Sequence, residues 1–217
     1  MNQVSGFVYS LPEDAPKTAR GRQTWQRLLE AAEKEFGERG FHEAAINRIT
    51  EGAGVAMGTF YVHFESKEAI FRALVFHMGH LTRRWIAGRV SGASDRLDAE
   101  RKGLEAFIEF ARENRDLYRI VNEAQFVAPD AYRQYYSDFA EAYAARLGDA
   151  SSKGEIRPGE DEQRAWALIG ASVFLGMKFG VWDDHGAAPA EVAENVGDLF
   201  AFGLSPKDAA EPRKKNK

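Results

Sequence analysis

The sequence predicts an all-α protein, and three features of the 217-residue chain carry this prediction. Apolar residues recur at the three- and four-residue spacing of amphipathic helices almost throughout. No convincing alternation of apolar and polar residues indicates a strand. Hydrophobic residues make up 44% of the chain, which is enough for a substantial core.

The first expected helix covers residues 22–39 and ends near Gly40. Its apolar stripe consists of Trp25, Leu28, Leu29, Ala32 and Phe36. This helix is expected to pack against two short helices that follow it. Together they form a three-helix unit, which we place at residues 18–75.

The two short helices, between residues 46 and 64, are joined by a glycine turn. Gly54 can take the left-handed conformation that ends a helix, and Val55 fills the corner. The apolar anchors are Ile46, Ile49, Ala53, Phe60 and Phe64. The second helix presents small, hydroxyl and aromatic groups outward: Met57, Gly58, Thr59, Tyr61, Val62 and His63. This arrangement is a helix-turn-helix, and such a surface suits a DNA groove.

A long fourth helix is predicted from Ser66, a good N-cap, to about Val90. Amphipathic stripes then indicate helices around residues 97–111, 117–124 and 132–147. These helices follow a loop and are expected to form a separate helical unit. The long fourth helix would join the two units.

Two further helices complete the predicted fold. The segment 161–182 is apolar over much of its circumference, which indicates burial on several sides. Pro189 fits the first turn of a last helix. We expect disorder in an N-terminal arm over 1–17 and in a basic tail over 205–217.

The charge balance at first argues against a nucleic-acid partner, since the net charge is -4 and the pI is near 5.8. The distribution matters more than the total, because Lys17, Arg20, Arg22 and Arg27 cluster around the start of the first helix. A solvated helix entry is the plain alternative for this cluster. Beside a helix-turn-helix, a DNA-facing edge is favoured.

Several classes of protein are not expected. The chain has no cysteine, which excludes disulfides and thiolate metal sites. No catalytic acid–base constellation, nucleophile elbow or phosphate-binding glycine loop occurs, so we expect no enzyme, metal or cofactor. Without an export signal or an uninterrupted apolar run of about 20 residues, we expect a cytoplasmic protein that does not span a membrane.

Several linked motifs resemble the DNA-binding domain of the TetR family of bacterial transcriptional regulators. They are Gly40-Phe41, Ile46-Asn47-Arg48-Ile49, Ala53-Gly54-Val55, Gly58-Thr59-Phe60-Tyr61-Val62-His63-Phe64 and Ser66-Lys67-Glu68. The matched region runs from about Thr18 to Leu74. The remainder agrees with the family only in its helical layout, which implies a ligand-binding and dimerisation domain over residues 76–204.

The resemblance implies that the second helix of the motif lies in the major groove of an operator. The expected DNA contacts are Arg20, Arg22, Asn47, Arg48, Met57, Gly58, Thr59, Tyr61, His63 and Lys67. Thr59, Tyr61 and Lys67 would hold phosphate, and packing under the fourth helix is the alternative for Tyr61 and His63.

This chain departs from the family where hydroxyl residues usually cap the two short helices and touch phosphate. Alanine stands there instead, at Ala44, Ala45 and Ala56. Met57 likewise occupies a place that is often basic or polar. The recognition surface is therefore unusually apolar, which favours methyl contacts to thymine and a low affinity for non-specific DNA.

Aromatic residues of the second unit predict a ligand pocket. The candidates are Phe107, Phe110, Tyr118, Phe126, Tyr132, Tyr135, Tyr136, Phe139, Tyr143 and Phe174. Ordinary core packing, with hydroxyls reaching solvent, is the alternative for any single one. The resemblance favours an apolar or aromatic small-molecule effector, with acyl thioesters among the candidates.

The last two helices are the expected homodimer interface. The candidates are Trp166, Ile169, Gly170, Val173, Gly176, Met177, Val192, Val196, Leu199 and Phe200. Glycine inside a helix costs up to about 1 kcal/mol relative to alanine. The glycines at Gly170, Gly176 and Gly180 therefore suggest the close approach of a partner helix. Packing within one subunit is the alternative.

The resulting hypothesis is a homodimeric repressor of the TetR type that a ligand releases from a palindromic operator. It would be associated with the nucleoid when bound to double-stranded DNA. The alternative is a helical small-molecule-binding or scaffolding protein whose degenerate helix-turn-helix no longer binds DNA.

Overall fold

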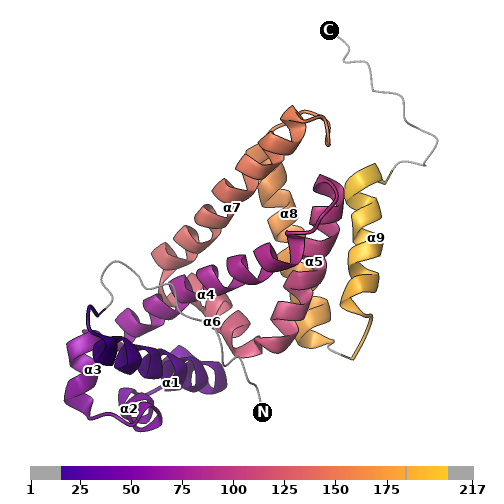
Figure 1. Ribbon diagram of the computed structural model, residues 1–217. Coiled ribbons are helices and arrows are strands. Elements are labelled where there is room, and N and C mark those ends of the chain that lie inside the picture. Colours follow the sequence, from indigo (N-terminus) through magenta and orange to yellow (C-terminus); the bar gives the residue numbers. More distant parts are fainter. Residues whose placement is uncertain (1–15, 184, 205–217) are drawn as a thin grey trace.

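A computed structural model describes residues 16–183 and 185–204, and every regular element within them is a helix (Figure 1). The elements are α1 (Ala19–Glu43), α2 (Ile46–Ala53), α3 (Met57–His63), α4 (Lys67–Val90), α5 (Arg96–Glu113), α6 (Arg115–Val127), α7 (Pro129–Ser152), α8 (Asp161–Leu175), η1 (Gly176–Trp182) and α9 (Pro189–Phe202). The predicted all-α fold is confirmed. The expected disorder of 1–17 and 205–217 falls outside the described residues, apart from Pro16 and Lys17 ahead of α1.

α1 begins earlier than its apolar stripe predicted. The Thr18 hydroxyl accepts a hydrogen bond from the Gly21 N–H at 3.1 Å and so caps the helix. At the other end, Gly40 takes a φ of 75°, which interrupts the regular helix near the predicted position. One short turn then continues to Glu43.

The first hydrophobic core lies among α1–α4 and extends into α6 and α7. Its fully buried side chains include Leu28, Phe36, Phe60, Phe71, Leu74 and Ile120. The expected domain boundary between residues 75 and 76 lies inside α4. Both a continuous helix and a continuous core therefore cross it.

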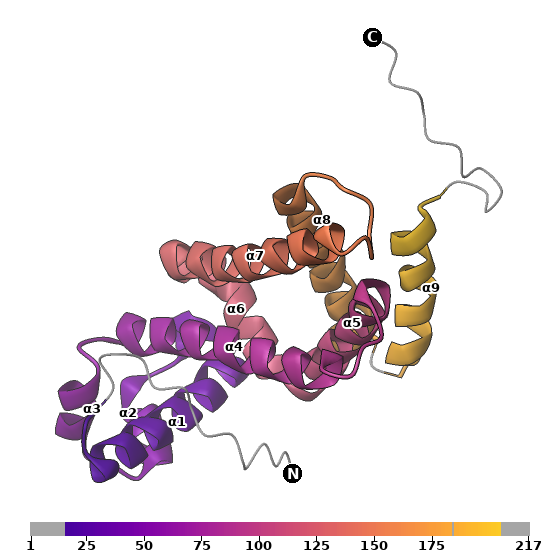
Figure 2. The ribbon, with the colours of Figure 1, turned by 45° about the horizontal axis from the view of Figure 1, so that its top comes forward.

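α4 has the predicted limits. The Ser66 Oγ accepts a hydrogen bond from the Ala69 N–H at 3.1 Å, and the helix runs to Val90. Figures 1 and 2 show α4 extending from the helix-turn-helix end of the molecule to the helices of the C-terminal half. One rigid element thus reaches both halves.

α5 is the centre of the C-terminal half, because α4, η1 and α9 all pack on it. Leu104 and Ile108 of α5 form a second core with Val192 and Ala193 of α9. α7 packs against α8 and α4 (Figure 2).

The single helix predicted over 161–182 is divided in the structure, because its last part, η1, is π-helical. This part lies very close to α5. A Cβ at Gly176 would lie 2.6 Å from Phe107 Cε1, and one at Gly180 would lie 2.8 Å from the Ala111 Cβ. At these two positions glycine therefore permits packing within one subunit, and not the approach of a partner helix that we expected.

α6 holds the end of α1 by two long-range hydrogen bonds. The Glu123 Oε1 accepts from the Phe41 N–H at 2.8 Å, and the Arg119 Nη1 donates to the Gly37 carbonyl at 2.6 Å. α6 also approaches α1 closely, since a Cβ at Gly37 would lie 2.3 Å from the Asp116 Cβ. The C-terminal half therefore holds the helix-turn-helix half at α1 as well as through α4.

A half-buried carboxyl in this contact makes folding stability depend on pH. Burial, followed by the nearby carboxylates of Asp116 and Glu30, raises the pKa of Glu33 from 4.5 to about 7. A carboxyl whose pKa is higher in the folded chain takes up its proton on folding. Stability is therefore lost as the pH rises from 4.5 towards about 7.

We predict that Glu33→Gln removes this loss. The free energy of unfolding should rise by up to about 3 kcal/mol at about pH 8 and change little at about pH 4. Urea denaturation at the two pH values measures it, with the exposed Glu38→Gln on the same helix as the control. An equal effect at both pH values would contradict the prediction.

Candidate DNA-binding surface and ligand cavity

α2 and α3 form the predicted helix-turn-helix. Gly54 takes the left-handed conformation (φ 63°, ψ 42°), and its N–H donates to the Glu51 carbonyl at 3.1 Å. The Val55 N–H donates to the Thr50 carbonyl at 3.0 Å, and its side chain packs on the first core. The turn thus directs α3 across α2 with Phe60 fully buried.

The outward face of α3 is apolar and accessible. Tyr61 is 55% exposed and Val62 is 79% exposed, while Met57 is exposed and Gly58 faces open space. This exposure excludes packing of Tyr61 under α4. His63 is half-buried, and burial lowers its pKa, so its imidazole adds no positive charge at neutral pH.

The short helices have no side-chain caps. Ala45 and Ala56 are the N-cap residues of α2 and α3, and neither makes a side-chain hydrogen bond to its helix. Ala44 is the C-cap of α1 and is buried. The free N–H groups at the start of α3 therefore remain available to an external acceptor.

Lys67 has a structural role that the sequence did not indicate. Its ammonium donates to three backbone carbonyls at the end of α1, at 2.7 Å to Phe41, 3.3 Å to His42 and 2.9 Å to Ala44. It also lies 4.5 Å from the centroid of the Phe41 ring. An ammonium has three N–H donors, so all of them are engaged within the chain in this structure, and the expected phosphate contact by Lys67 stays a prediction.

Arg48 and Arg22 are also engaged within the chain. Arg48 Nε lies 2.5 Å from Glu35 Oε1, and its Nη2 donates to the Glu43 carbonyl at 2.5 Å. Burial opposes ionisation of Glu35, but the hydrogen bonds from Arg48 and Ala45 lower its pKa, so the pair is ionic. Arg22 donates to the Lys17 carbonyl at 2.6 Å.

Arg20 and Asn47 are the exposed polar members of the expected DNA-contact set. The start of α1 lies beside the end of α3, since the rings of Trp25 and Phe64 stack with centroids 6.2 Å apart. Arg20, in the first turn of α1, is therefore at the end of α1 that lies near α3.

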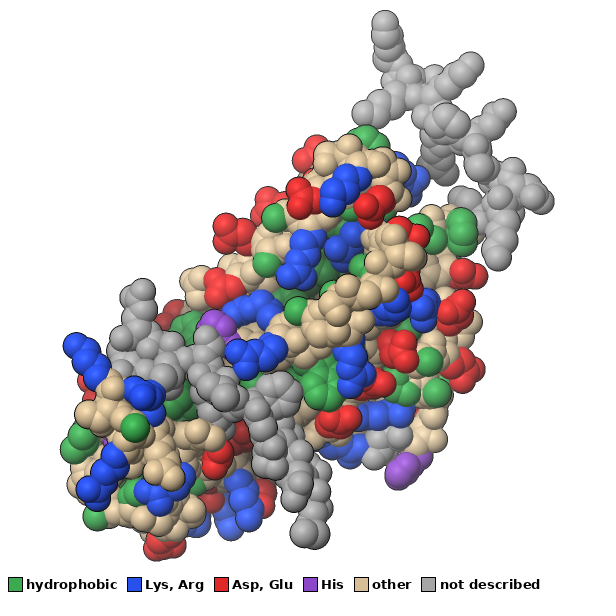
Figure 3. Space-filling view, in the orientation of Figure 1, with side chains coloured by type: hydrophobic (Ala, Val, Ile, Leu, Met, Phe, Trp, Pro, Cys, Tyr) green, Lys and Arg blue, Asp and Glu red, His purple; other side chains and the backbone are tan. Residues whose placement is uncertain are grey.

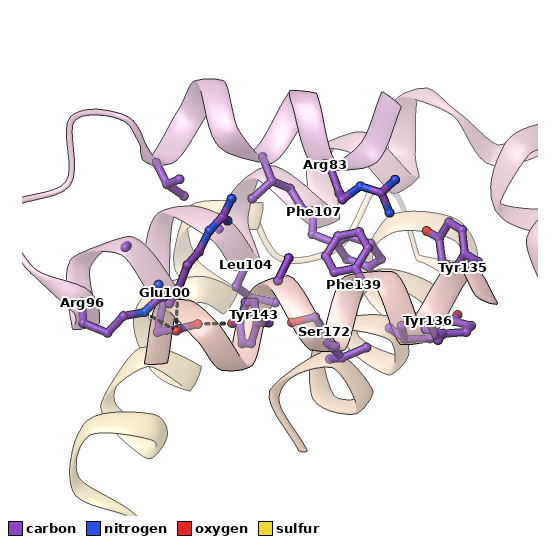
Figure 4. A pocket seen from close by; sticks show the side chains of 18 residues that line it. Arg83, Arg96, Glu100, Leu104, Phe107, Tyr135, Tyr136, Phe139, Tyr143 and Ser172 are labelled. Atoms are coloured by element: carbon purple, nitrogen blue, oxygen red, sulfur yellow. Dashed lines mark hydrogen bonds and ion pairs between the residues drawn. The ribbon is translucent and has the colours of Figure 1, made fainter. Parts of the chain in front are cut away.

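A cavity of about 280 Å³ lies between α4, α5, α7 and α8 (Figure 4). Five of the ten predicted ligand residues line it: Phe107, Tyr135, Tyr136, Phe139 and Tyr143. In the space-filling view, hydrophobic side chains are recessed between α7 and α4, and basic side chains surround them (Figure 3). This volume is near the lower end of the range for small-molecule sites.

The other five predicted ligand residues lie elsewhere. Phe110 belongs to the first core, and Tyr132 packs against it. The Tyr118 hydroxyl donates to the Val173 carbonyl at 2.5 Å. Phe126 is 82% exposed and Phe174 is 67% exposed, because each lies on the outer side of its helix.

The cavity is also lined by residues that were not among the predicted ligand residues. The charged ones are Arg83, Arg96, Glu100 and Arg146. Arg96 Nε donates to Glu100 Oε1 at 2.7 Å, and the Tyr143 hydroxyl donates to Glu100 Oε2. The i,i+4 spacing of Arg96 and Glu100 beside Leu104 was the available signal for this buried pair.

The expected dimer residues divide into two groups. Trp166 and Leu199 are exposed and Gly170 faces open space, and Phe174, Trp182 and Phe202 on the same elements or their continuation are exposed too. Met177 is half-buried. The remaining candidates pack within the subunit: Ile169 and Val173 line the cavity, Gly176 meets Phe107, and Val192, Val196 and Phe200 belong to the second core.

The helix formed by α8 and η1 is long and apolar enough, by length and composition, to cross a membrane, and among the described helices it alone meets this test. Arg164 and Lys178 interrupt the apolar run of this helix, so no such segment was expected from the sequence. Only 22% of its apolar window is buried in the chain. Within residues 16–183 and 185–204, no group of three or more His, Asp or Glu is placed to hold a metal ion.

Comparison with known proteins agrees with this geometry. A model of the family described as "Bacterial regulatory proteins, tetR family" matches residues 28–74. The HTH-type transcriptional regulator YdgC of Bacillus subtilis strain 168 is 32% identical over 197 residues, which cover 87% of this chain and 96% of that protein.

Solved structures share the fold at lower identity. The regulator FadR from Bacillus subtilis, in complex with stearoyl-CoA, has a TM-score of 0.71 at 18% identity and covers 83% of this chain and 100% of its own. AibR, in complex with isovaleryl coenzyme A and operator DNA, has a TM-score of 0.65 at 16% identity and covers 83% and 98%.

We predict that Lys67→Met destabilises the fold. Three carbonyls lose a charged donor, so the free energy of unfolding should fall by about 2 kcal/mol. Urea denaturation measures this change, with the exposed Lys34→Met on α1 as the control. A variant as stable as the wild type would show that water replaces the ammonium without cost.

Proposed function

The chain belongs to the TetR family of bacterial transcriptional regulators, which are not enzymes, and we propose that it is a repressor that a small molecule releases from DNA. In this proposal a homodimer binds a palindromic operator through one α3 from each subunit. It acts in the cytoplasm and is associated with the nucleoid when bound to DNA.

The observation that carries the proposal is the position of α4. Its start follows the helix-turn-helix, while Arg83, Ile86 and Val90 near its end line the cavity. A ligand that pushes α4 away from α7 would therefore tilt the helix that carries the DNA-binding unit. The two recognition helices would then no longer match successive major grooves.

The cavity supports an apolar or aromatic effector of moderate size. Leu104, Phe107, Phe139 and Ile169 supply apolar walls to the cavity. FadR and AibR, which share the fold, are described with stearoyl-CoA and isovaleryl coenzyme A. Acyl thioesters are therefore among the candidate effectors.

The α3 surface supports reading of base edges by apolar contact. Met57, Tyr61 and Val62 are exposed there and are suited to thymine methyl groups. Arg20, Asn47 and Thr59, with the uncapped N–H groups of α3, would contact phosphate. Arg48 and Lys67 would instead stabilise the helix-turn-helix half through their contacts within the chain.

The alternative is a helical ligand-binding protein that no longer binds DNA. Its support is the absence of side-chain caps on α2 and α3 and the engagement of Lys67 and Arg48 within the chain. Measurement of DNA binding separates the two functions.

We predict that the wild type selects a palindrome from a random duplex library. Arg20→Ala should reduce the salt dependence of binding to that palindrome by about one unit, because one phosphate contact is lost. Met57→Ala should relax preference at one base pair with an unchanged salt slope. Gel-shift titrations at several salt concentrations measure both effects.

The matched control is Arg157→Ala, which removes an exposed charge in the loop between α7 and α8. It should leave affinity and slope unchanged. Failure of the wild type to enrich any sequence would favour the alternative function.

The exposed aromatic residues of α8, η1 and α9 support the dimer. Trp166, Phe174, Trp182 and Phe202 are all exposed in one subunit, although large apolar surfaces are usually covered in a stable monomer. We attribute this apolar surface, including that of the long helix Asp161–Trp182, to contact with a second copy of the chain.

We predict that Phe174→Glu produces monomers, because a charge at the centre of an apolar interface is desolvated without a partner. Analytical ultracentrifugation at micromolar concentration measures the change. Phe126→Glu is the control, since Phe126 is even more exposed but lies on α6. Sedimentation of the wild type as a monomer would contradict the proposed dimer.

A further inference from the structure

The cavity is lined by more positively charged than negatively charged side chains. Arg83, Arg96 and Arg146 line it together with one acid, Glu100. Figure 4 shows Arg83 on one side of the view and the Arg96, Glu100 and Tyr143 cluster on the other, with Leu104 and Phe107 between them. The two sides differ in how far their polar groups are satisfied.

The Glu100 carboxylate is fully engaged. Its Oε1 binds Arg96, and its Oε2 accepts from the Tyr143 hydroxyl. The Arg96 guanidinium also lies over the Tyr143 ring, 5.4 Å from the centroid. This cluster closes one side of the cavity and offers no free charge to a ligand.

Arg83 is not satisfied in this way. Its Nη1 is buried and has no hydrogen-bond partner, and its Nη2 makes a long contact of 3.5 Å with His80 Nδ1. Among the described residues, no carboxylate lies within ion-pair distance of it. A half-buried guanidinium whose buried Nη1 donor has no partner calls for an anionic acceptor.

Neighbouring residues place the Arg83 guanidinium at the edge of the apolar part of the cavity. It lies 6.0 Å from the centroid of the Phe139 ring. A Cβ at Gly79 would lie 3.3 Å from Nη1 and 3.2 Å from Tyr135 Cδ2, so the glycine leaves room for both groups. Burial and the Arg83 charge lower the pKa of His80, which leaves that imidazole neutral beside the guanidinium.

We propose that the effector is an organic acid with a free carboxylate, which binds Arg83, and with an apolar or aromatic body that lies between Leu104, Phe107 and Phe139. A carboxylate would accept a hydrogen bond from the buried Arg83 Nη1 and would supply a negative charge beside the guanidinium. This inference rests on the proposed function and names the class of its ligand.

Isothermal titration calorimetry without DNA tests the proposal, so it can fail independently of operator binding. The probes are octanoate, 4-phenylbutanoate, the two alcohols of the same carbon skeletons, and octanoyl-CoA. The wild type should bind at least one acid more tightly than its alcohol by at least about tenfold. Arg83→Met should abolish this preference, and Arg83→Lys should retain part of it.

The control variant is Arg146→Met, which removes an exposed charge from the same cavity. It should keep the preference for the acid. Equal binding of acid and alcohol by the wild type, no binding of either acid at millimolar concentration, or binding of octanoyl-CoA alone would each overturn the proposal. The wild-type comparison decides the matter even if Arg83→Met does not fold.

Discussion

The backbone carbonyl groups at the end of α1 are the point on which this structure depends, because a helix end leaves them without partners inside the helix. Lys67 of α4 binds those of Phe41, His42 and Ala44, and Arg119 of α6 binds another from the preceding turn. Three helices from distant parts of the sequence are thereby joined where α2 begins. A shift of α4 or α6 would reach the helix-turn-helix through these bonds.

Local signals were sufficient to predict most of the fold. Ser66 and Gly54 mark helix ends by interactions within a few residues, and the structure has both ends where we expected them. The π-helical form of η1 could not be predicted, because it accompanies the close approach of α5 at Gly176 and Gly180, and α5 is far away in the sequence.

The candidate sites were less predictable, because they too depend on contacts between segments that are far apart in the sequence. The aromatic stripe of α7 supplied four of the residues that line the cavity, but periodicity assigns a charged side chain such as Arg83 or Glu100 to solvent. An apolar stripe does not distinguish contact within a subunit from contact between subunits, so Val192 was assigned to the dimer although it is buried in the second core. Nor does a motif reveal that the Lys67 ammonium is already bound.

The π-helical turn has a geometric consequence for the outer surface of its helix. In an α-helix, residues four apart overshoot one turn, so a stripe with this spacing winds slowly around the axis. In a π-helix, four residues fall short of a turn and the winding reverses. Along Trp166, Gly170, Phe174, Lys178 and Trp182, the phase drift of the first half is cancelled in the second. Trp166 and Trp182, at the two ends of this stripe, therefore lie on about the same side of the helix, so that one neighbouring helix can contact both ends.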